Sequence, residues 1–345
     1  MKKRYGHEIA GWDLAQKNER SLSLGKIAES YFDAYMDIDE LTKHMIIAGS
    51  TGSGKTVAGQ VVIEEALSKK VAVVVIDPTC QWTGFLKELE DEAMKKRNAM
   101  FNMKKDRVKI PVTIINLNAN TTVKEAKSYL NNGELTIFTA NLLTEAELDI
   151  FIHKFVTSFF SNVPNESQEL KVLLVFEEIH RILPKYGGTG AGFLAIERGV
   201  REFRKWGIGI ILISQVLEDF RGEIRANIGT EIQMRTSYEV DLGKITTKYG
   251  DPIAKAVVRA ETGTGLFHNS AYNIGQPYFV MFRPITHSIQ RLSEKELNHY
   301  EQLSQKIQDM EPKVSEDDYN LKLAKEKLKT GNLKAVEMFL EGLQQ

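Results

Sequence analysis

The chain has 345 residues, of which 42% are hydrophobic and 26% are charged, so it is long enough and apolar enough to bury a full core. Its formal net charge of −1 gives no overall attraction to nucleic acid, and Cys80, the only cysteine, excludes an intramolecular disulfide. No apolar run approaches the length that spans a bilayer, and no signal peptide follows the basic N-terminus. We therefore expect a cytoplasmic protein without direct membrane insertion.

Three segments with different patterns follow one another along the chain. Residues 1–43 predict a linker or hairpin that leads into the core, and residues 44–285 alternate apolar β-branched runs with helical stretches. This alternation predicts βαβ crossovers and an α/β fold with a mostly parallel sheet. The predicted strands are 21–27, 35–38, 45–48, 71–76, 112–117, 135–139, 172–176, 208–213, 230–234 and 278–282. Thr144 and Glu147 form a capping box before an amphipathic helix, and residues 286–345 predict a helical C-terminal appendage.

The segment 49–56 fits the phosphate-binding pattern G-x-x-x-x-G-K-[ST], with a strand-like run before it and helical periodicity after it. Its glycines let the backbone curl so that N–H groups point at phosphate oxygens, at the positive end of the following helix. We expect Lys55 to reach the β- and γ-phosphates and the Thr56 hydroxyl to ligate Mg²⁺. The predicted ATP-binding residues are Gly49, Ser50, Thr51, Gly52, Ser53, Gly54, Lys55 and Thr56.

Two adjacent glutamates follow the predicted strand 172–176, at the sheet edge where ligands bind in open α/β sheets. Glu177 is expected to hold Mg²⁺ through water, and Glu178 to polarise the attacking water as general base. Asp77 also ends a predicted strand. It either supports this site from behind or only begins a turn with Pro78, and the pattern favours neither alternative.

The remaining candidate site residues lie around the predicted strand 208–213. Gln215 follows this strand and is expected to sense the γ-phosphate or to position the water. Before the strand, a predicted helix carries a cationic face, and Arg201 or Arg204 is expected to reach the γ-phosphate of a neighbouring subunit. The alternative for these arginines is a solvated helix face.

These motifs resemble those of a known family. The segment from His44 to Thr56 looks like the phosphate loop of HerA-type ATPases, within the HerA/FtsK superfamily, and residues 177–180 are similar to the family's Glu-Glu-Ala-His motif. Residues 201–207, followed by Gln215, resemble its arginine and sensor-glutamine segments, although Phe203 stands where the family usually has glycine. The resemblance covers roughly residues 21–285. It implies a P-loop NTPase fold of the RecA-like, ASCE type and a hexameric ring that threads double-stranded DNA, with active sites between subunits.

Only about 40 residues precede the phosphate loop, so we expect a short form without the N-terminal β-barrel with which HerA docks a nuclease. A nuclease or another accessory partner therefore stays an open alternative. Two segments are candidate DNA contacts: the glycine-rich loop 184–192, and the run 95–109 with seven basic residues against one acidic. A plain connector and a solvated face are the respective alternatives. His180 is expected to orient the two glutamates by hydrogen bonding rather than to bind a metal.

The sequence thus predicts an ATP hydrolase of the translocase or helicase type, a homo-oligomer that couples Mg²⁺-ATP hydrolysis to movement along duplex DNA. One alternative keeps the motor and changes its cargo, as in conjugation, secretion or viral packaging. The other is a slow nucleotide-dependent switch subunit, which has less need of a general base such as Glu178.

Overall fold

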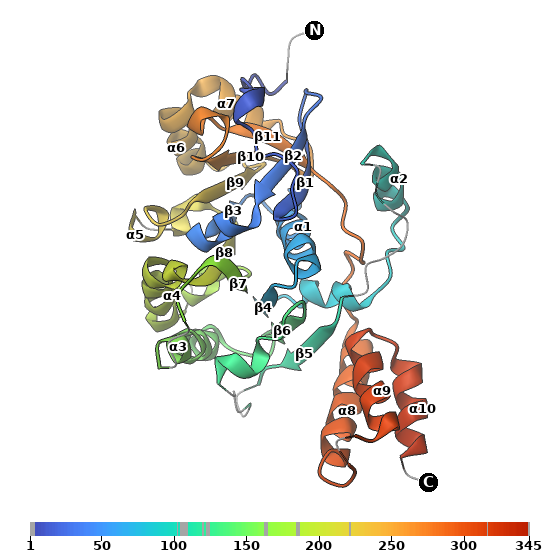
Figure 1. Cartoon of the computed structure of the whole chain (residues 1–345). Coiled ribbons are helices and arrows are strands. Elements are labelled where there is room, and N and C mark those ends of the chain that lie inside the picture. Colours follow the sequence, from blue (N-terminus) through green and yellow to red (C-terminus); the bar gives the residue numbers. More distant parts are fainter. Residues whose placement is uncertain are drawn as a thin grey trace.

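The computed structural model describes residues 4–343 except 102, 104–109, 119–120, 122–124, 162–164, 184–186, 221 and 316. Within this part of the chain, one 11-stranded sheet runs through the molecule in the order β2-β1-β11-β10-β9-β3-β8-β7-β4-β6-β5 (Figure 1). The strands are β1 (Ser21–Ile27), β2 (Asp33–Asp37), β3 (Met45–Ala48), β4 (Ala72–Asp77), β5 (Val112–Asn116), β6 (Leu135–Thr139), β7 (Ser167–Phe176), β8 (Trp206–Ser214), β9 (Thr230–Met234), β10 (Thr264–Asn269) and β11 (Tyr278–Phe282).

From β9 to β5 in this order, every pair of neighbouring strands is parallel, which confirms the predicted α/β fold with a mostly parallel sheet. All residues of β3, β4 and β8 are buried, because helices cover both faces of this half. This burial explains why these strands read as continuous apolar runs in the sequence. At the other end, β10, β11, β1 and β2 pair antiparallel.

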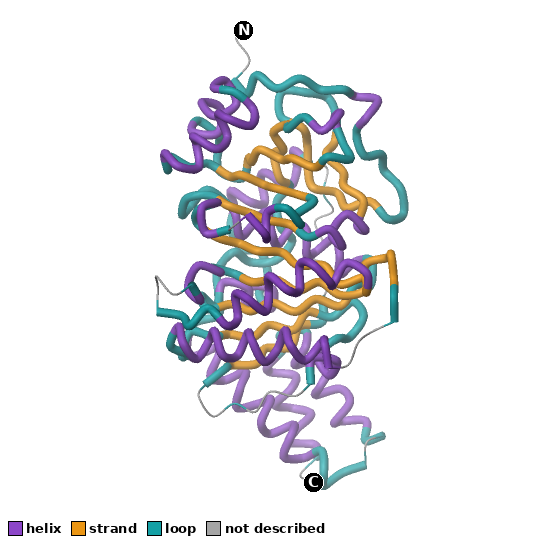
Figure 2. Tube along the Cα trace, turned by 90° about the vertical axis from the view of Figure 1, so that its left-hand side faces the viewer, coloured by secondary structure: helices purple, strands orange, loops and turns teal. Residues whose placement is uncertain are grey.

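The helices form a layer on each face of the sheet (Figures 1 and 2). They are α1 (Lys55–Ser68), α2 (Glu92–Met100), α3 (Glu145–Ser161), α4 (Ala191–Glu202), α5 (Gly222–Arg225), α6 (Glu239–Tyr249), α7 (Asp251–Val258), α8 (Glu294–Met310), α9 (Tyr319–Lys329) and α10 (Leu333–Gly342). Helix α1 and the C-terminal helices share one core cluster, whereas α3 and α4 belong to the cluster on the other face. The predicted capping box at Thr144 is present, since Thr144 Oγ1 accepts from Glu147 N at 3.3 Å and Glu147 Oε2 accepts from Thr144 N at 2.8 Å.

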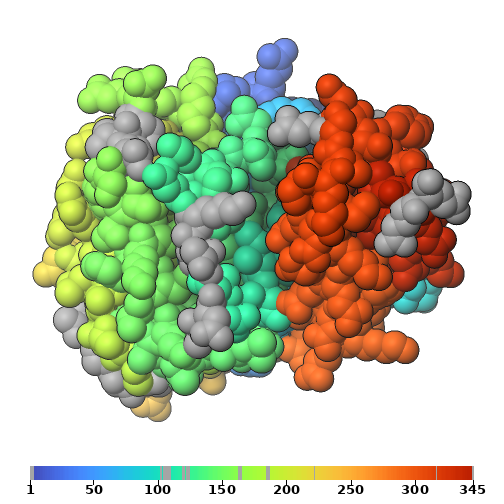
Figure 3. Space-filling view, turned by 90° about the horizontal axis from the view of Figure 1, so that it is seen from below, coloured from blue at the N-terminus to red at the C-terminus, as the bar shows by residue number. Residues whose placement is uncertain are grey.

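Helices α8 to α10 form a bundle beside the β5 end of the sheet, and Figure 3 shows it from below as an orange-to-red lobe next to the body. The hydroxyl of Tyr300 accepts a hydrogen bond from the backbone N of Ile114 at 3.1 Å, and Lys329 pairs with Glu134 at 2.8 Å. Gly331 adopts a positive φ of 76° between α9 and α10. Among the residues that the structure describes, every helix is too short or too polar to span a bilayer.

Candidate active site

The phosphate loop follows β3 at the carboxyl edge of the parallel strands, and its backbone needs glycine. Gly49, Gly52 and Gly54 have φ values of 154°, 74° and 95°. A Cβ on Gly49 would lie 2.6 Å from Met234 Cβ, and one on Gly54 would lie 3.0 Å from the backbone N of Gly263. Substitution at either glycine would therefore push the loop away from the neighbouring strands.

Backbone hydrogen bonds hold the loop to two other segments of the sheet. Ser50 N donates to the carbonyl of Arg235, just after β9, at 2.9 Å, and Gly263 N, just before β10, donates to the Ser53 carbonyl at 3.0 Å. Ser53 Oγ is buried and has no hydrogen-bond partner among the described residues. The N-cap of α1 is Gly54, which provides no side-chain cap. The amide end of α1 is thus open to an anion, as phosphate binding requires.

Two side chains at the start of α1 contact the two glutamates that follow β7. Thr56 Oγ1 donates to Glu177 Oε1 at 3.0 Å, and Lys55 Nζ lies 3.5 Å from Glu178 Oε1. The Lys55 side chain is only 7% exposed and that of Glu178 14%, so this pair is largely shielded from water. The structure therefore brings together the predicted phosphate, metal and base residues, which are separated by about 120 positions in the sequence.

Glu177 is buried and receives two hydrogen bonds, from Thr56 and from the indole Nε1 of Trp82 at 3.0 Å. Burial, together with the nearby carboxylates of Asp77 and Glu178, raises the pKa of Glu177 to about 8 despite these hydrogen bonds. A buried carboxyl that resists ionisation by itself is stabilised as a carboxylate when a divalent cation binds beside it. Because Glu177 and the Thr56 hydroxyl are hard oxygen donors, the pair fits Mg²⁺.

Glu178 has the opposite electrostatic character. Burial pushes its pKa up, but hydrogen bonding with His180 and the charge of Lys55 outweigh burial and leave the pKa lowered. The ring Nδ1 of His180 lies 3.1 Å from Glu178 Oε2, which is the contact expected for a histidine that orients this carboxylate. The backbone of Glu178 has a left-handed conformation with φ 48°. A strained residue of this kind is held in place by its surroundings and is frequent at active sites.

Asp77 ends β4 and is fully buried behind Glu177. Its carboxylate accepts hydrogen bonds from Thr79 N at 2.9 Å, Thr79 Oγ1 at 2.7 Å and Trp82 N at 2.8 Å. Asp77 therefore organises the turn that follows β4, and the same turn carries Trp82 to Glu177. The sequence left open whether Asp77 supports the site or only begins a turn. The hydrogen bonds favour a combination of the two, in which Asp77 holds the turn and the turn supports the site.

Gln215 follows β8, which lies between β3 and β7 in the sheet, so its backbone is at the same edge as the phosphate loop. Arg201 and Arg204 precede β8 and are at the amino edge instead. Strand β8 has nine residues, or about 30 Å, so these arginines are remote from the phosphate loop of their own chain. They line an open hollow of about 850 Å³ together with Lys43 and Lys205.

The two arginines differ in their contacts. Arg201 Nη1 pairs with Glu197 Oε1 at 2.8 Å. Arg204 is exposed and makes no ion pair with the residues that the structure describes. Its guanidinium is therefore the freer of the two.

Two residues near the loop, Trp82 and Arg235, were not predicted from the sequence because no motif marks them, and a third, Arg97, was predicted only as part of a basic run. Trp82 contacts Glu177, and the carbonyl of Arg235 holds Ser50. The Arg97 guanidinium on α2 packs against Gly263, since a Cβ there would lie 3.1 Å from Nη1. Arg97 belongs to the predicted basic run 95–109, of which residues 102 and 104–109 lie outside the described residues, as do 184–186 of the glycine-rich loop.

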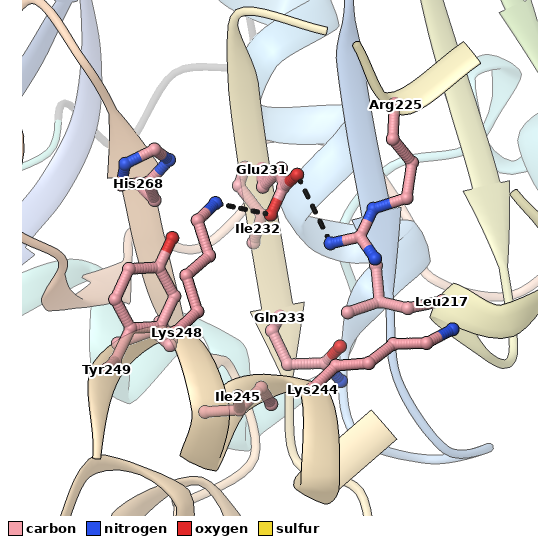
Figure 4. A pocket seen from close by; sticks show the side chains of 11 residues that line it. Leu217, Arg225, Glu231, Ile232, Gln233, Lys244, Ile245, Lys248, Tyr249 and His268 are labelled. Carbon is pink, nitrogen blue, oxygen red and sulfur yellow. Dashed lines mark hydrogen bonds and ion pairs between the residues drawn. The ribbon is translucent and has the colours of Figure 1, made fainter. Parts of the chain in front are cut away.

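A small cavity beside β9 is a second place where charged groups gather (Figure 4). Its volume is about 20 Å³, which is at most room for one water molecule. Glu231 pairs there with Arg225 and with Lys248, each at 3.4 Å. The space is far too small for a nucleotide, so the phosphate loop remains the candidate site.

Comparison with known proteins agrees with this geometry. Residues 22–178 match the family model described as the central domain of the helicase HerA, which includes the phosphate loop and both glutamates. This segment is therefore similar to the HerA central domain. A curated relative, an uncharacterised protein of Aquifex aeolicus (strain VF5), is 36% identical over 77 residues, or 21% of this chain and 28% of that protein. The chain thus matches little more than a quarter of that relative's length.

Solved structures resemble the HerA-type domain and its surroundings in fold. VirB4 of Thermoanaerobacter pseudethanolicus has a TM-score of 0.50 at 15% identity, over 77% of this chain and 97% of that chain. The genome packaging NTPase B204 of Sulfolobus turreted icosahedral virus 2, in complex with AMPPCP, has a TM-score of 0.42 at 14% identity, over 69% and 96%. The pCW3 conjugation coupling protein TcpA, with ATPγS, has a TM-score of 0.45 at 16% identity, over 79% and 67%.

Proposed function

We propose that the protein is a Mg²⁺-dependent ATP hydrolase that works as a homo-oligomeric, hexameric ring and moves double-stranded DNA. The observation that carries this proposal is the joint contact of Lys55 with Glu178 and of Thr56 with Glu177 at the end of an open phosphate loop. In the proposed roles, these four residues of one chain would supply a phosphate ligand, a pair of metal ligands and a general base. A nucleotide-binding scaffold needs only the first of these.

In this mechanism the loop amides and Lys55 bind the β- and γ-phosphates. Thr56 and Glu177 hold Mg²⁺, which would neutralise charge that develops on the phosphates. Glu178 takes the proton of the attacking water, and Gln215 orients that water beside the γ-phosphate. Because Lys55 Nζ lies 3.5 Å from Glu178 Oε1, phosphates that attract Lys55 would also release the Glu178 carboxylate for its role as base.

The oligomeric part of the proposal rests on where the arginines lie. An arginine that stabilises the transition state must reach the γ-phosphate, and Arg201 and Arg204 are at the opposite edge of the sheet from their own phosphate loop. A second subunit, placed so that its amino edge faces the first subunit's phosphate loop, would supply the missing cation. A ring satisfies this requirement for every subunit, because head-to-tail contacts close on themselves.

The DNA part rests on the likeness of residues 22–178 to the HerA central domain. Lys95 and Lys96 on α2 are exposed, as contacts to a phosphate backbone require. The main alternative is a motor with another cargo, because VirB4 of T. pseudethanolicus shares the fold. A slow nucleotide switch is disfavoured by the placement of Glu178 against Lys55 and His180, since binding alone has no use for an oriented base. An accessory nuclease would join the ring as a separate partner.

The test is the steady-state ATPase rate with and without long duplex DNA, at low and moderate salt. We expect Mg²⁺-dependent turnover that rises with DNA length and falls with added salt. Glu178→Gln should abolish turnover on and off DNA, and Glu125→Gln, at an exposed position, should change neither rate. A rate that requires Glu178 but ignores DNA would refute the DNA cargo and favour the secretion-type motor. No Mg²⁺-dependent turnover at all would refute the motor.

A further inference from the structure

Trp82 contacts Glu177 at the candidate site, but the proposed mechanism gives Trp82 no role. Its side chain is fully buried, and its indole Nε1 donates to Glu177 Oε2 at 3.0 Å. The other oxygen, Oε1, accepts from Thr56 at 3.0 Å. A buried indole N–H nearly always has a polar partner, and here that partner is the carboxyl group beside the phosphate loop. Both oxygens of Glu177 are thus tied to donors from different elements, which sets the rotation of the carboxyl group.

The chain around Trp82 is built to hold this position. Asp77 accepts a hydrogen bond from Trp82 N at 2.8 Å, and Cys80 turns the backbone with a positive φ of 60°. The far end of the indole lies against α1, because a Cβ on Gly59 would be 3.6 Å from the ring. Trp82 therefore lies between the helix that follows the phosphate loop and the carboxyl group that follows β7. It touches both halves of the site.

The connection between β11 and α8, residues 283–293, holds the turn that carries Trp82 from outside. Leu292 N donates to Thr83 Oγ1 at 2.8 Å, and a Cβ on Gly84 would lie 2.3 Å from the Ser288 carbonyl. The ring of Phe85 stacks on His287, with 3.6 Å between centroids. The turn that carries the indole is thus held by residues 283–293, while the indole itself lies against α1.

We propose that Trp82 is a positioning residue that aims the Glu177 carboxylate at the metal site shared with Thr56. This inference rests on the proposed role of Glu177 as a Mg²⁺ ligand. The indole N–H donates to Glu177 Oε2 and the Thr56 hydroxyl donates to Oε1, so the two donors fix the plane in which the carboxyl group faces the metal site. The indole fixes one oxygen and leaves the other for the metal. Outer partners of metal ligands typically change metal affinity or activity by about 10- to 100-fold when they are removed.

The experiment compares Trp82→Phe with Trp206→Phe, which changes the other buried tryptophan, at the amino edge of β8. We expect Trp82→Phe to raise the Mg²⁺ concentration for half-maximal ATPase about 10-fold or more. The affinity for ATP in EDTA should stay within about 2-fold, because the loop amides and Lys55 are unchanged. Trp206→Phe should leave both quantities as in the wild type. An unchanged Mg²⁺ dependence in Trp82→Phe would overturn the inference.

A second readout does not depend on turnover. The chain has three tryptophans, so a Trp12→Phe/Trp206→Phe variant leaves Trp82 as the only indole. Adding MgCl₂ in the presence of a non-hydrolysable ATP analogue should change the emission of Trp82, and Glu177→Gln should abolish the change. If Trp82→Phe does not fold, replacing Trp82 with the benzothienyl isostere, which lacks only the N–H donor, provides the same test with the shape preserved. Emission that ignores Mg²⁺ would count against the inference.

The two proposals fail in different ways. If Glu177→Gln retains wild-type Mg²⁺ dependence, Glu177 is not a metal ligand and the proposed metal site is wrong. If Glu177→Gln impairs Mg²⁺ use but Trp82→Phe and the isostere do not, the metal site stands and only the positioning role of Trp82 is lost.

Discussion

The two edges of the parallel half of the sheet are built in opposite ways. At the carboxyl edge, the groups of the candidate site are buried and bonded to one another, as in the contact of Thr56 with Glu177. At the amino edge, basic and acidic side chains together line an open hollow, and the Arg201 side chain is 49% exposed although it pairs with Glu197. Burial at the first edge fixes geometry, which chemistry needs, while exposure at the second leaves the Arg204 guanidinium accessible to another molecule. This difference supports the proposal that one chain holds most of an ATPase site and that a cation from a second chain completes it.

The largest effect on the ATPase rate is expected from removing a cation at the amino edge of the sheet. We expect Arg204→Ala to lower kcat by about 10³-fold, since a trans arginine stabilises charge in the transition state. Mixing Arg204→Ala subunits with Lys55→Ala subunits, inactive alone, should restore part of the ATPase rate, because each type supplies what the other lacks. Arg201→Ala is the matched control and should lose less, since Arg201 is held by Glu197. No restoration in mixed rings would mean that the amino edge plays no part in catalysis.

The carboxyl edge is tested by removing the base. Glu178→Gln keeps the size of the side chain but cannot accept the proton of water, so kcat should fall at least about 10²-fold. ATP binding should remain, because Lys55 would be released from its partner. Isothermal titration of an ATP analogue and single-turnover rates measure the two effects separately. Mixing Glu178→Gln subunits with Lys55→Ala subunits should not restore the ATPase rate, in contrast to mixtures that contain Arg204→Ala subunits. A variant that hydrolyses ATP at the normal rate would remove Glu178 from the mechanism.

The burial of the carboxyl edge predicts a pH effect on stability. Burial raises the pKa of Glu177 to about 8, so the folded state keeps a proton that the unfolded chain loses near pH 4.5. The stability contributed by this proton is complete below pH 4.5 and is lost as pH rises toward 8. Without Mg²⁺, Tm should therefore fall over this range more in the wild type than in Glu177→Gln. Added Mg²⁺ should raise the wild-type Tm most near pH 8. Parallel pH profiles of the two proteins would contradict the burial of an ionisable group there.

The smallest expected effect concerns a contact that belongs to neither edge. Tyr300→Phe leaves the buried backbone N of Ile114 without its acceptor, which should cost about 1–3 kcal/mol of unfolding free energy. Chemical denaturation measures this cost. The ATPase rate should stay within about 2-fold of the wild type, because α8 contacts β5 at the far end of the sheet. A large loss of activity would show that the C-terminal bundle acts on the site directly.

The sequence determined the elements whose signals are local. Strands such as β3, β4 and β8 are buried on both faces, so each is a continuous apolar run that can be read without the fold. The phosphate loop is likewise a local pattern, because the glycines and Lys55 act within one turn of backbone. Strand β10 is absent from the predicted strands because Gly265 and polar residues interrupt its apolar run. It forms a strand by pairing with β9 and β11.

The contacts between these elements depend on the tertiary structure and cannot be read from the sequence. Thr56 and Glu177 are 121 residues apart, and Trp82 and Glu177 are 95 apart, so neither contact leaves a periodicity that a sequence can display. Because β3 and β8 run parallel, Arg204, which precedes β8, and Lys55, which follows β3, lie at opposite edges of the sheet. Local patterns arise from the geometry of neighbouring residues, whereas the pairing of distant strands is decided by burial summed over the whole sheet. The candidate residues could therefore be named from the sequence, whereas the contacts between them could not.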